Sequence, residues 1–274
     1  MKNEYVSERE IIAEIAHKAG QSTAYTQGAG GNVSVKTADG KMIIKASGCR
    51  LKDVSPEYGL ACVSLDPVKE MLSRDEISGT EFGLAISLAQ FPLCGKKARP
   101  SVETGFHAML PRYVIHHHSV YANFISCCRS GLEMSMELFP ECRFIPFCMP
   151  GMELCLAIRE NLKDRPLRSD KAEIFFFANH GLAVAAGDAE TACKAMHYVN
   201  DSIKKYYRLP VFCPCPDSHS VPGCLTLDQL LYLPDPSQKP SSETEKEILA
   251  AAKFICSEHK KAGLSSSYIS RALS

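Results

Sequence analysis

Residues 174–186 read Ile-Phe-Phe-Phe-Ala-Asn-His-Gly-Leu-Ala-Val-Ala-Ala, two apolar runs joined by a short polar turn. The run 174–177 is apolar throughout, which is typical of a central strand that is covered on both faces. Asn179-His180-Gly181 ends this run, and residues 182–186 form a second apolar run. These residues therefore predict two buried strands, joined by a polar turn at a strand end where a cleft can open.

Strand and helix patterns alternate on both sides of this stretch. The Asp39-Gly40 step favours a hairpin between its flanking apolar segments. Asp188 is a typical N-cap, and the residues after it keep helical spacing. We predict strands over residues 33–36, 41–45, 59–65 and 113–115, and helices over residues 80–90, 102–110, 120–128 and 151–162. This alternation predicts an α/β fold around one core.

The composition changes near residue 209. Seven prolines fall between residues 209 and 240, which is typical of an ordered loop or linker. A final helix is predicted over 242–262, because Ser242 and Glu245 have the spacing of a capping box. We therefore assign residues 1–208 to the main domain, and residues 209–274 to a Pro-rich connection and a C-terminal helical arm of the same domain.

Charge and apolar content exclude several classes of protein. The chain has 274 residues, with 31 Lys+Arg and 31 Asp+Glu. A general nucleic-acid or membrane-surface binder needs a net basic field, so we predict neither partner. No apolar run approaches the roughly 20 residues that span a bilayer, and the charged N-terminus lacks a signal-peptide pattern. The expected location is the cytoplasm, where the thirteen Cys would be reduced and mostly buried thiols.

His116 and His118 follow the predicted strand at 113–115. Residues two apart on a strand point to the same face, so both imidazoles can reach one ion, whereas His117 points away. On its own this pair could equally be a surface run or two buried core histidines. His180, at the strand end described above, is the natural third ligand. Three His ligands with one open position form the pattern of catalytic zinc.

Glu103 lies at the predicted start of the helix 102–110, upstream of the histidine strand. Partial burial would raise its pKa towards neutrality and suit it to general acid–base catalysis. A Glu in a first helical turn is also explained simply by the helix dipole. His107 lies on the same helical face, and we expect it to support the site or the core. His197 and His259 are expected to be solvated or partly buried.

Gly28-Ala-Gly-Gly-Asn32 does not match the dinucleotide-binding fingerprint, because Val33 stands where that fingerprint needs a Gly. Its backbone N–H groups could still cradle an anion. The turn at Ser47-Gly48 offers a hydroxyl and further N–H groups.

In their order and spacing these motifs resemble the class II aldolase/adducin superfamily, in particular the L-fuculose- and L-rhamnulose-phosphate aldolases. The resemblance covers roughly residues 7–207. The matching segments are Gly-Gly-Asn32-Val-Ser34, Ala46-Ser47-Gly48, Pro100-Ser101-Val-Glu103, His116-x-His118 and Asn179-His180-Gly181. The resemblance implies a three-layer α/β/α fold with a central, largely antiparallel sheet, and a homotetramer.

The resemblance also implies residue roles. His116, His118 and His180 would bind Zn²⁺ or another divalent metal, and Glu103 would exchange protons with the substrate. The positions that grip the substrate phosphate match Gly31, Asn32, Ser47, Gly48 and Ser101. The implied activity is that of a metal-dependent aldehyde-lyase, which reversibly cleaves a sugar, in particular a ketose 1-phosphate, to dihydroxyacetone phosphate and an aldehyde.

Other branches of the superfamily stay open as alternatives. Val102 stands where the better-known sugar-phosphate aldolases carry a second Ser, so one phosphate hydroxyl is missing. Dehydratases and sugar-acid phosphate decarboxylases keep similar His and Glu positions. The 4-epimerases place Asp where Glu103 stands, and adducin-like members are binding modules without metal, which the four intact site residues disfavour.

Overall fold

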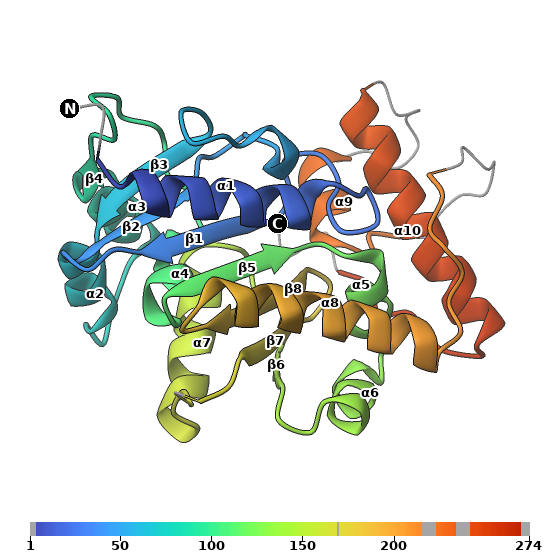
Figure 1. Ribbon diagram of the computed structural model, residues 1–274. Coiled ribbons are helices and arrows are strands. Elements are labelled where there is room, and N and C mark those ends of the chain that lie inside the picture. Colours follow the sequence, from blue (N-terminus) through green and yellow to red (C-terminus); the bar gives the residue numbers. More distant parts are fainter. Residues whose placement is uncertain (1–3, 169, 215–222, 234–241, 270–274) are drawn as a thin grey trace.

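The computed structural model describes residues 4–168, 170–214, 223–233 and 242–269. Its strands are β1 Asn32–Lys36, β2 Lys41–Lys45, β3 Leu60–Ser64, β4 Gln90–Phe91, β5 Tyr113–His117, β6 Arg143–Ile145, β7 Glu173–Phe177 and β8 Gly181–Ala186. They form one sheet in the order β4-β3-β2-β1-β5-β8-β7-β6 (Figure 1). The paired strands within this part of the chain are antiparallel except β6 and β7. The expected central, largely antiparallel sheet is confirmed.

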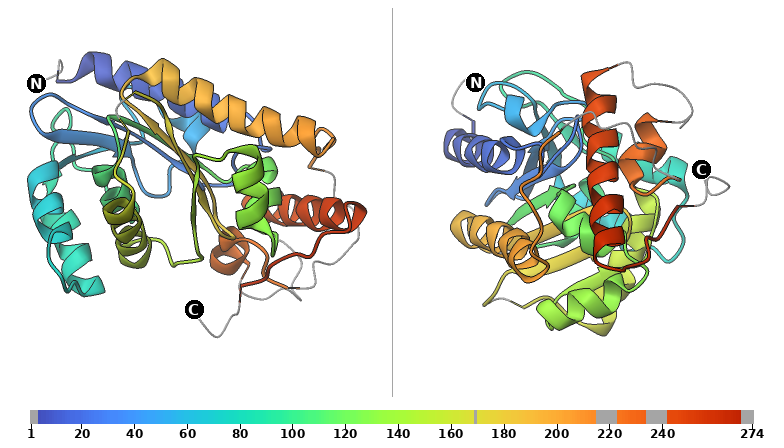
Figure 2. Two further views of the ribbon diagram at one scale, coloured as in Figure 1. Left: turned by 90° about the horizontal axis from the view of Figure 1, so that it is seen from below. Right: turned by 90° about the vertical axis from the view of Figure 1, so that its right-hand side faces the viewer.

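Helices cover both faces of this sheet. They are α1 Val6–Gly20, α2 Leu65–Leu72, α3 Gly79–Leu88, α4 Thr104–Met109, α5 Val120–Ser126, α6 Gly131–Leu138, α7 Met152–Asp164, α8 Ala189–Tyr206, α9 Leu227–Tyr232 and α10 Glu243–Lys261. In the left view of Figure 2, α1 and α8 lie on one side of the sheet, and α2, α3 and α7 lie on the other. The three-layer arrangement is therefore also as predicted.

Two apolar cores result from the alternation of side chains along the strands. Val33 and Ile115 join one core with residues of α1, α5 and α8. Met42 and Val114 join the other with residues of α2, α3, α4 and α7. Since successive strand residues point to opposite faces, His116 lies on the face of the second core, and His117 lies on the face of the first.

Strand β5 lies in the middle of the sheet, with β1 on one side and β8 on the other. His116 is paired in register with Asn32 of β1 and with Ala183 of β8. This pairing brings the ends of three strands together, and with them the Gly-rich turn before β1 and the turn 178–180 before β8.

The predicted loop over residues 209–240 is wrong in one part. Residues 227–232 form α9, whose cap Thr226 accepts a hydrogen bond from the Gln229 backbone N–H. Residues 215–222 and 234–241 of that stretch lie outside the described residues. The predicted final helix is confirmed as α10, and its expected capping box of Ser242 and Glu245 is present.

Two further findings concern the helices and the cysteines of the described residues. Within the described residues, no helix has the length and apolar character needed to cross a membrane. Each cysteine of that part of the chain is free, and most of these thiols are buried. The expected reduced thiols therefore agree with the structure.

Candidate metal centre

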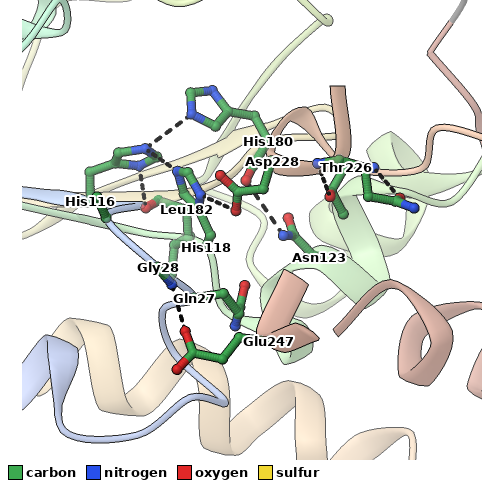
Figure 3. Close-up of polar contacts among 12 residues, drawn as sticks. Gln27, Gly28, His116, His118, Asn123, His180, Leu182, Thr226, Asp228 and Glu247 are labelled. Carbon is green, nitrogen blue, oxygen red and sulfur yellow. Dashed lines mark hydrogen bonds and ion pairs between the residues drawn. The ribbon is translucent and has the colours of Figure 1, made fainter. Parts of the chain in front are cut away.

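Three buried histidines meet at the end of β5. His116 comes from β5, His118 follows that strand, and His180 lies in the turn before β8 (Figure 3). His116 Nε2 lies 3.2 Å from His180 Nε2 and 3.1 Å from His118 Nε2. The ligand atoms of the three residues lie within 4.8 Å of one another. The three predicted metal ligands are thus brought to one point.

These spacings suit a zinc ion. With Zn–N bonds of about 2.0–2.1 Å, two ligands at the corners of a tetrahedron lie about 3.3 Å apart. That value is close to the 3.1 and 3.2 Å separations of the imidazole nitrogens. The donor set, three imidazoles beside a carboxylate, also belongs to the borderline-soft chemistry that zinc prefers.

The hydrogen bonds at Nδ1 of His116 and His118 indicate that a positive charge is needed between the rings. His116 Nδ1 donates to the Leu182 carbonyl at 3.0 Å, and His118 Nδ1 donates to the Asp228 carboxylate at 2.6 Å. With the hydrogens on Nδ1, the neutral rings direct Nε2 lone pairs at each other across 3.1 Å. Two facing lone pairs repel unless a proton or a metal cation lies between them. The residues therefore fit a metal at this point.

The ring of His180 is held differently. Its Nδ1 is buried without a hydrogen-bond partner in the structure. Its backbone N–H donates to Phe177, and the preceding Asn179 adopts a left-handed conformation with φ 55°. The tight turn 177–180, together with the packing of Phe177 on the His180 ring, directs this imidazole at His116.

Glu103 completes the cluster. It is the N-cap residue of α4, and its side chain is 9% exposed. Its Oε1 lies 3.2 Å from His116 Nε2 and 3.4 Å from His180 Nε2. Asn32 Nδ2 donates to Oε2 at 3.4 Å, and the Glu103 backbone N–H donates to Ser101 Oγ. These contacts hold the Glu103 carboxylate beside the Nε2 atoms of His116 and His180.

The pKa of Glu103 differs from the expected direction. Burial raises it, as predicted, but the charges and hydrogen bonds of His116 and His180 lower it well below the ordinary value. The prediction of a pKa near neutrality is therefore wrong, because it took account of burial and omitted the neighbouring imidazoles. Glu103 is a carboxylate at neutral pH, which is the form that accepts a proton.

The pKa values of His180 and His118 follow from burial and from the Glu103 and Asp228 carboxylates. Burial lowers the pKa of His180 to about 4. Burial also lowers the pKa of His118, but the Asp228 carboxylate raises it above the ordinary value. His180 is therefore neutral at pH 7, as a metal ligand must be.

Three other histidines, His107, His117 and His259, have structural partners. His117 points to the opposite face as expected, where Asn200 donates to its Nε2 at 3.3 Å. His107 lies 2.7 Å from Ser34 Oγ and packs on Phe106. His259 is more deeply buried than predicted, and Phe124 O lies 2.6 Å from its Nε2.

The two turns expected to bind phosphate lie beside this cluster. Gly31 has φ 74°, and a side chain on it would meet the His116 carbonyl at 2.8 Å, so only Gly allows this approach. The buried Lys45 ammonium links the turns by donating to the Ala29 carbonyl at 3.1 Å and the Cys49 carbonyl at 2.7 Å. Ser47 and Gly48 are exposed at the second turn.

Fewer backbone N–H groups are free in these turns than the sequence suggested. The Gly28 N–H donates to Glu247, the Gly30 N–H to Gln27, and the Ser47 N–H to Arg99. Asn32 directs its amide at Glu103. Among the five residues predicted to hold phosphate, the exposed Ser47 and Gly48 and the half-buried Ser101 remain accessible.

A cavity of about 570 Å³ lies between α3, α7 and the segment before α4. Ser101 and Arg99 line it, together with Phe82, Met149 and Met152. It does not include the three histidines. It therefore adjoins Ser101 and is not lined by the metal ligands.

Asp228 is the site residue that the sequence did not reveal. It comes from α9, and its carboxylate holds His118 from a distance of 110 residues along the chain. Thr226 and Gln229 do form a capping-box pattern at the start of this helix. That pattern was the signal that could have identified α9.

Comparison with known proteins places these features in context. The sequence profile described as Class II Aldolase and Adducin N-terminal domain matches residues 10–207. The uncharacterized oxidoreductase YuxG of Bacillus subtilis is 28% identical over 65% of this chain, but the match spans 27% of that protein's length. The 3-oxo-tetronate 4-phosphate decarboxylase of Escherichia coli K12 is 26% identical, with 73% of this chain and 86% of that protein covered.

A solved structure supports the fold. The N-terminal class II aldolase domain of a conserved protein from Thermoplasma acidophilum superposes with a TM-score of 0.62 at 18% identity. The match covers 74% of this chain and 94% of that one.

Proposed function

This chain belongs to the Class II Aldolase and Adducin N-terminal domain family, and we propose that it is a zinc-dependent lyase that breaks a carbon–carbon bond in a small sugar or sugar phosphate. The favoured reaction is reversible cleavage of a ketose 1-phosphate to dihydroxyacetone phosphate and an aldehyde. The observation that supports it best is the meeting of three buried imidazole nitrogens and the Glu103 carboxylate at one point.

His116, His118 and His180 would hold the ion. When bound, it would supply Lewis-acid polarisation of the substrate oxygens. Three protein ligands leave a coordination position for the substrate, whereas a structural site closes with a fourth. Zinc is proposed because of the imidazole donors and their separations, and another divalent ion would use the same ligands.

Glu103 would move the proton. In the synthetic direction its carboxylate accepts a proton from the carbon beside the ketone of dihydroxyacetone phosphate, and the C–H electron pair shifts towards the ketone oxygen. In the cleavage direction the same group returns that proton to carbon. The lowered pKa keeps Glu103 in the ionised form that can accept a proton, and its burial limits access of competing water.

Gly31, Asn32, Ser47, Gly48 and Ser101 are proposed to position the phosphate end of the substrate. Ser47 and Ser101 supply hydroxyls, and Gly31 lets its turn lie close to His116. Asn32 acts here through Glu103, to which its amide is hydrogen-bonded. Val102 offers no hydroxyl, so phosphate would be held by fewer groups than in the better-known sugar-phosphate aldolases.

A decarboxylase is the second candidate. The name of the E. coli relative, a 3-oxo-tetronate 4-phosphate decarboxylase, supports it. Loss of carbon dioxide from a 3-oxo acid also leaves an electron pair beside a ketone, so it makes the same demand on the site as aldol cleavage. Dehydratase and 4-epimerase activities use related sites and rank lower, and the buried histidine cluster disfavours a non-catalytic adducin-like binding module.

We also propose that the chain works as a cytoplasmic homotetramer. In this proposal residues 1–208 form the catalytic domain, and residues 209–274 form an arm that belongs to it. Light scattering coupled to gel filtration measures the assembly directly, and a monomer at micromolar concentration would reject the tetramer.

One assay separates the candidate reactions. The zinc-loaded protein is incubated with ketose 1-phosphates and with 3-oxo sugar-acid phosphates, and the release of dihydroxyacetone phosphate and of carbon dioxide is measured in parallel. Dihydroxyacetone phosphate supports the aldolase, and carbon dioxide supports the decarboxylase. Zinc-loaded protein that releases neither product from either panel would reject both.

A further inference from the structure

A carboxylate from outside the matched family region reaches the metal ligands. Asp228 Oδ2 lies 2.6 Å from His118 Nδ1, and the two side chains are only 5% and 6% exposed. Asp228 belongs to α9, beyond the family match at residues 10–207. Figure 3 shows it beside His118, on the opposite side from His116.

The backbone around Asp228 is fixed to the turn that carries His180. The Leu227 N–H donates to the Asn179 carbonyl at 2.7 Å, and the Asn179 side-chain amide donates to the Leu225 carbonyl at 2.7 Å. Leu227 and Leu230 of α9 are buried in a small apolar cluster. The carboxylate is therefore held in one place by its own helix.

Burying a carboxylate costs free energy unless a partner compensates for the lost hydration. The buried position of Asp228 therefore needs an explanation. Among the three rings, His118 is the one whose Nδ1 contacts a carboxylate. His116 uses the Leu182 backbone carbonyl, and His180 Nδ1 has no partner in the structure. Asp228 is thus the carboxylate that contacts the Nδ1 edge of a metal ligand.

We propose that Asp228 is a positioning residue for the metal centre. By accepting the Nδ1 hydrogen of His118, it fixes the ring and its tautomer, so that Nε2 directs a lone pair at the point that His116 and His180 also face. The proposal rests on the proposed function, since it assumes an ion at that point. It makes the C-terminal arm part of the metal centre.

Zinc affinity tests this role without reference to turnover. Loss of a group that orients a ligating His typically weakens metal binding by about 10- to 100-fold. We expect Asp228→Asn, which is nearly isosteric, to weaken zinc binding within that range in competition with a chromophoric chelator. Asp228→Ala should weaken it at least as much. The visible absorption of the Co²⁺-substituted protein should change in both variants.

A matched control lies in the same arm. Glu247 of α10 accepts from the Gly28 N–H at 2.8 Å and pairs with Arg50 at 3.0 Å, and it holds the arm without contacting a histidine in the structure. Glu247→Gln should leave zinc affinity within about twofold of the wild type. Circular dichroism and thermal unfolding of the metal-free proteins check that each variant is folded.

Three results would overturn the proposal. Equal zinc affinity in Asp228→Asn, Asp228→Ala and the wild type would show that the carboxylate does not position the ligand. A loss in Glu247→Gln as large as that in Asp228→Asn would show that docking of the arm matters rather than the carboxylate. A wild-type protein without zinc affinity would remove the proposed function itself, and this inference with it.

Discussion

Two opposing effects determine the charge of Glu103. Burial favours the neutral acid, and the imidazoles of His116 and His180 favour the carboxylate more strongly. Asn32 donates to the oxygen that faces away from them. The side chain is therefore ionised and oriented before any substrate binds, which is the state that a general base requires.

Glu103→Gln should keep the metal and lose the reaction. The amide has nearly the same shape but cannot accept a proton in the way a carboxylate does, so we expect kcat to fall by at least about 10²-fold. Steady-state rates and zinc content measure the two effects separately. The exposed Glu133 of α6 gives a matched control, since Glu133→Gln should keep the wild-type rate. Near-normal turnover in Glu103→Gln would contradict the assigned role.

At this scale the sequence predicted which histidines lie close together. Side chains alternate between the two faces of a strand, which places His116 and His118 on one face and His117 on the other. This prediction needs only local geometry. Asp228 could not be found in this way, because it contacts His118 across 110 residues and comes from a proline-rich stretch. The pKa of Glu103 was likewise beyond a local argument, since it depends on rings from two other elements.

Strands β5 and β8 meet closely at Gly181. A side chain there would lie 2.5 Å from the His117 carbonyl, 3.2 Å from His118 Cδ2 and 3.3 Å from His116 Cε1. The absence of a side chain at this position thus allows the strand ends to bring both rings together. Gly181 is therefore needed for the close packing of His116 and His118 as well as for the turn.

Gly181→Ala should therefore damage both stability and metal binding. Forcing an extra methyl group against backbone costs about 1–3 kcal/mol, and displacement of the two rings should weaken zinc binding. Urea unfolding and chelator competition measure these effects. Gly187, at the far end of β8, has nothing within 4 Å of the corresponding position. Gly187→Ala should leave both quantities near wild type, and equal losses in the two variants would count against this account.

Long elements were predicted better than short ones. The apolar runs of β7 and β8, the cap of α8 and the cap of α10 are local signals, and each was found where expected. Strand β4, with two residues, and α9, with six, carry too little periodicity to be recognised. They acquire their structure from neighbours, β4 from pairing with β3, and α9 from its contacts with Asn179.

In the whole molecule, the C-terminal arm joins parts that lie far apart in sequence. Helix α10 contacts the Gly-rich turn through Glu247, and α9 reaches His118 through Asp228. Figure 1 shows both helices at the same end of the sheet. Alternation of strands and helices predicted the fold class, and the family resemblance supplied the antiparallel sheet. The parallel β6–β7 pair was not predicted, because no local pattern reports which strands become neighbours.

A buried ion pair on the other side of the molecule should make stability depend on pH. Arg143 Nε donates to Glu173 Oε2 at 3.0 Å, and the Arg168 backbone N–H donates to Oε1 at 2.8 Å. Burial raises the pKa of Glu173, but these bonds and charges lower it overall below its ordinary value. A lowered carboxylate pKa adds stability above the unfolded-state value, about 4.5, that is lost as pH falls through the folded-state value.

Glu173→Gln should consequently lower the free energy of unfolding by roughly 3 kcal/mol at pH 7, since Arg143 stays buried without its charged partner. The gap between the two proteins should shrink as the pH falls below about 4.5. Urea titrations with chelator in every sample measure it free of metal effects. A gap that stays constant from pH 7 to pH 3 would contradict the role of the Glu173 charge.

Metal content tests the central claim most directly. The protein is purified without added zinc or chelator, and its metals are measured per chain by elemental analysis beside His118→Ala. We expect close to one zinc or other divalent ion per wild-type chain. The variant should contain none and lose activity while its circular dichroism spectrum stays unchanged. An active wild-type protein without metal, or a His118→Ala protein that keeps its full metal content, would contradict the account.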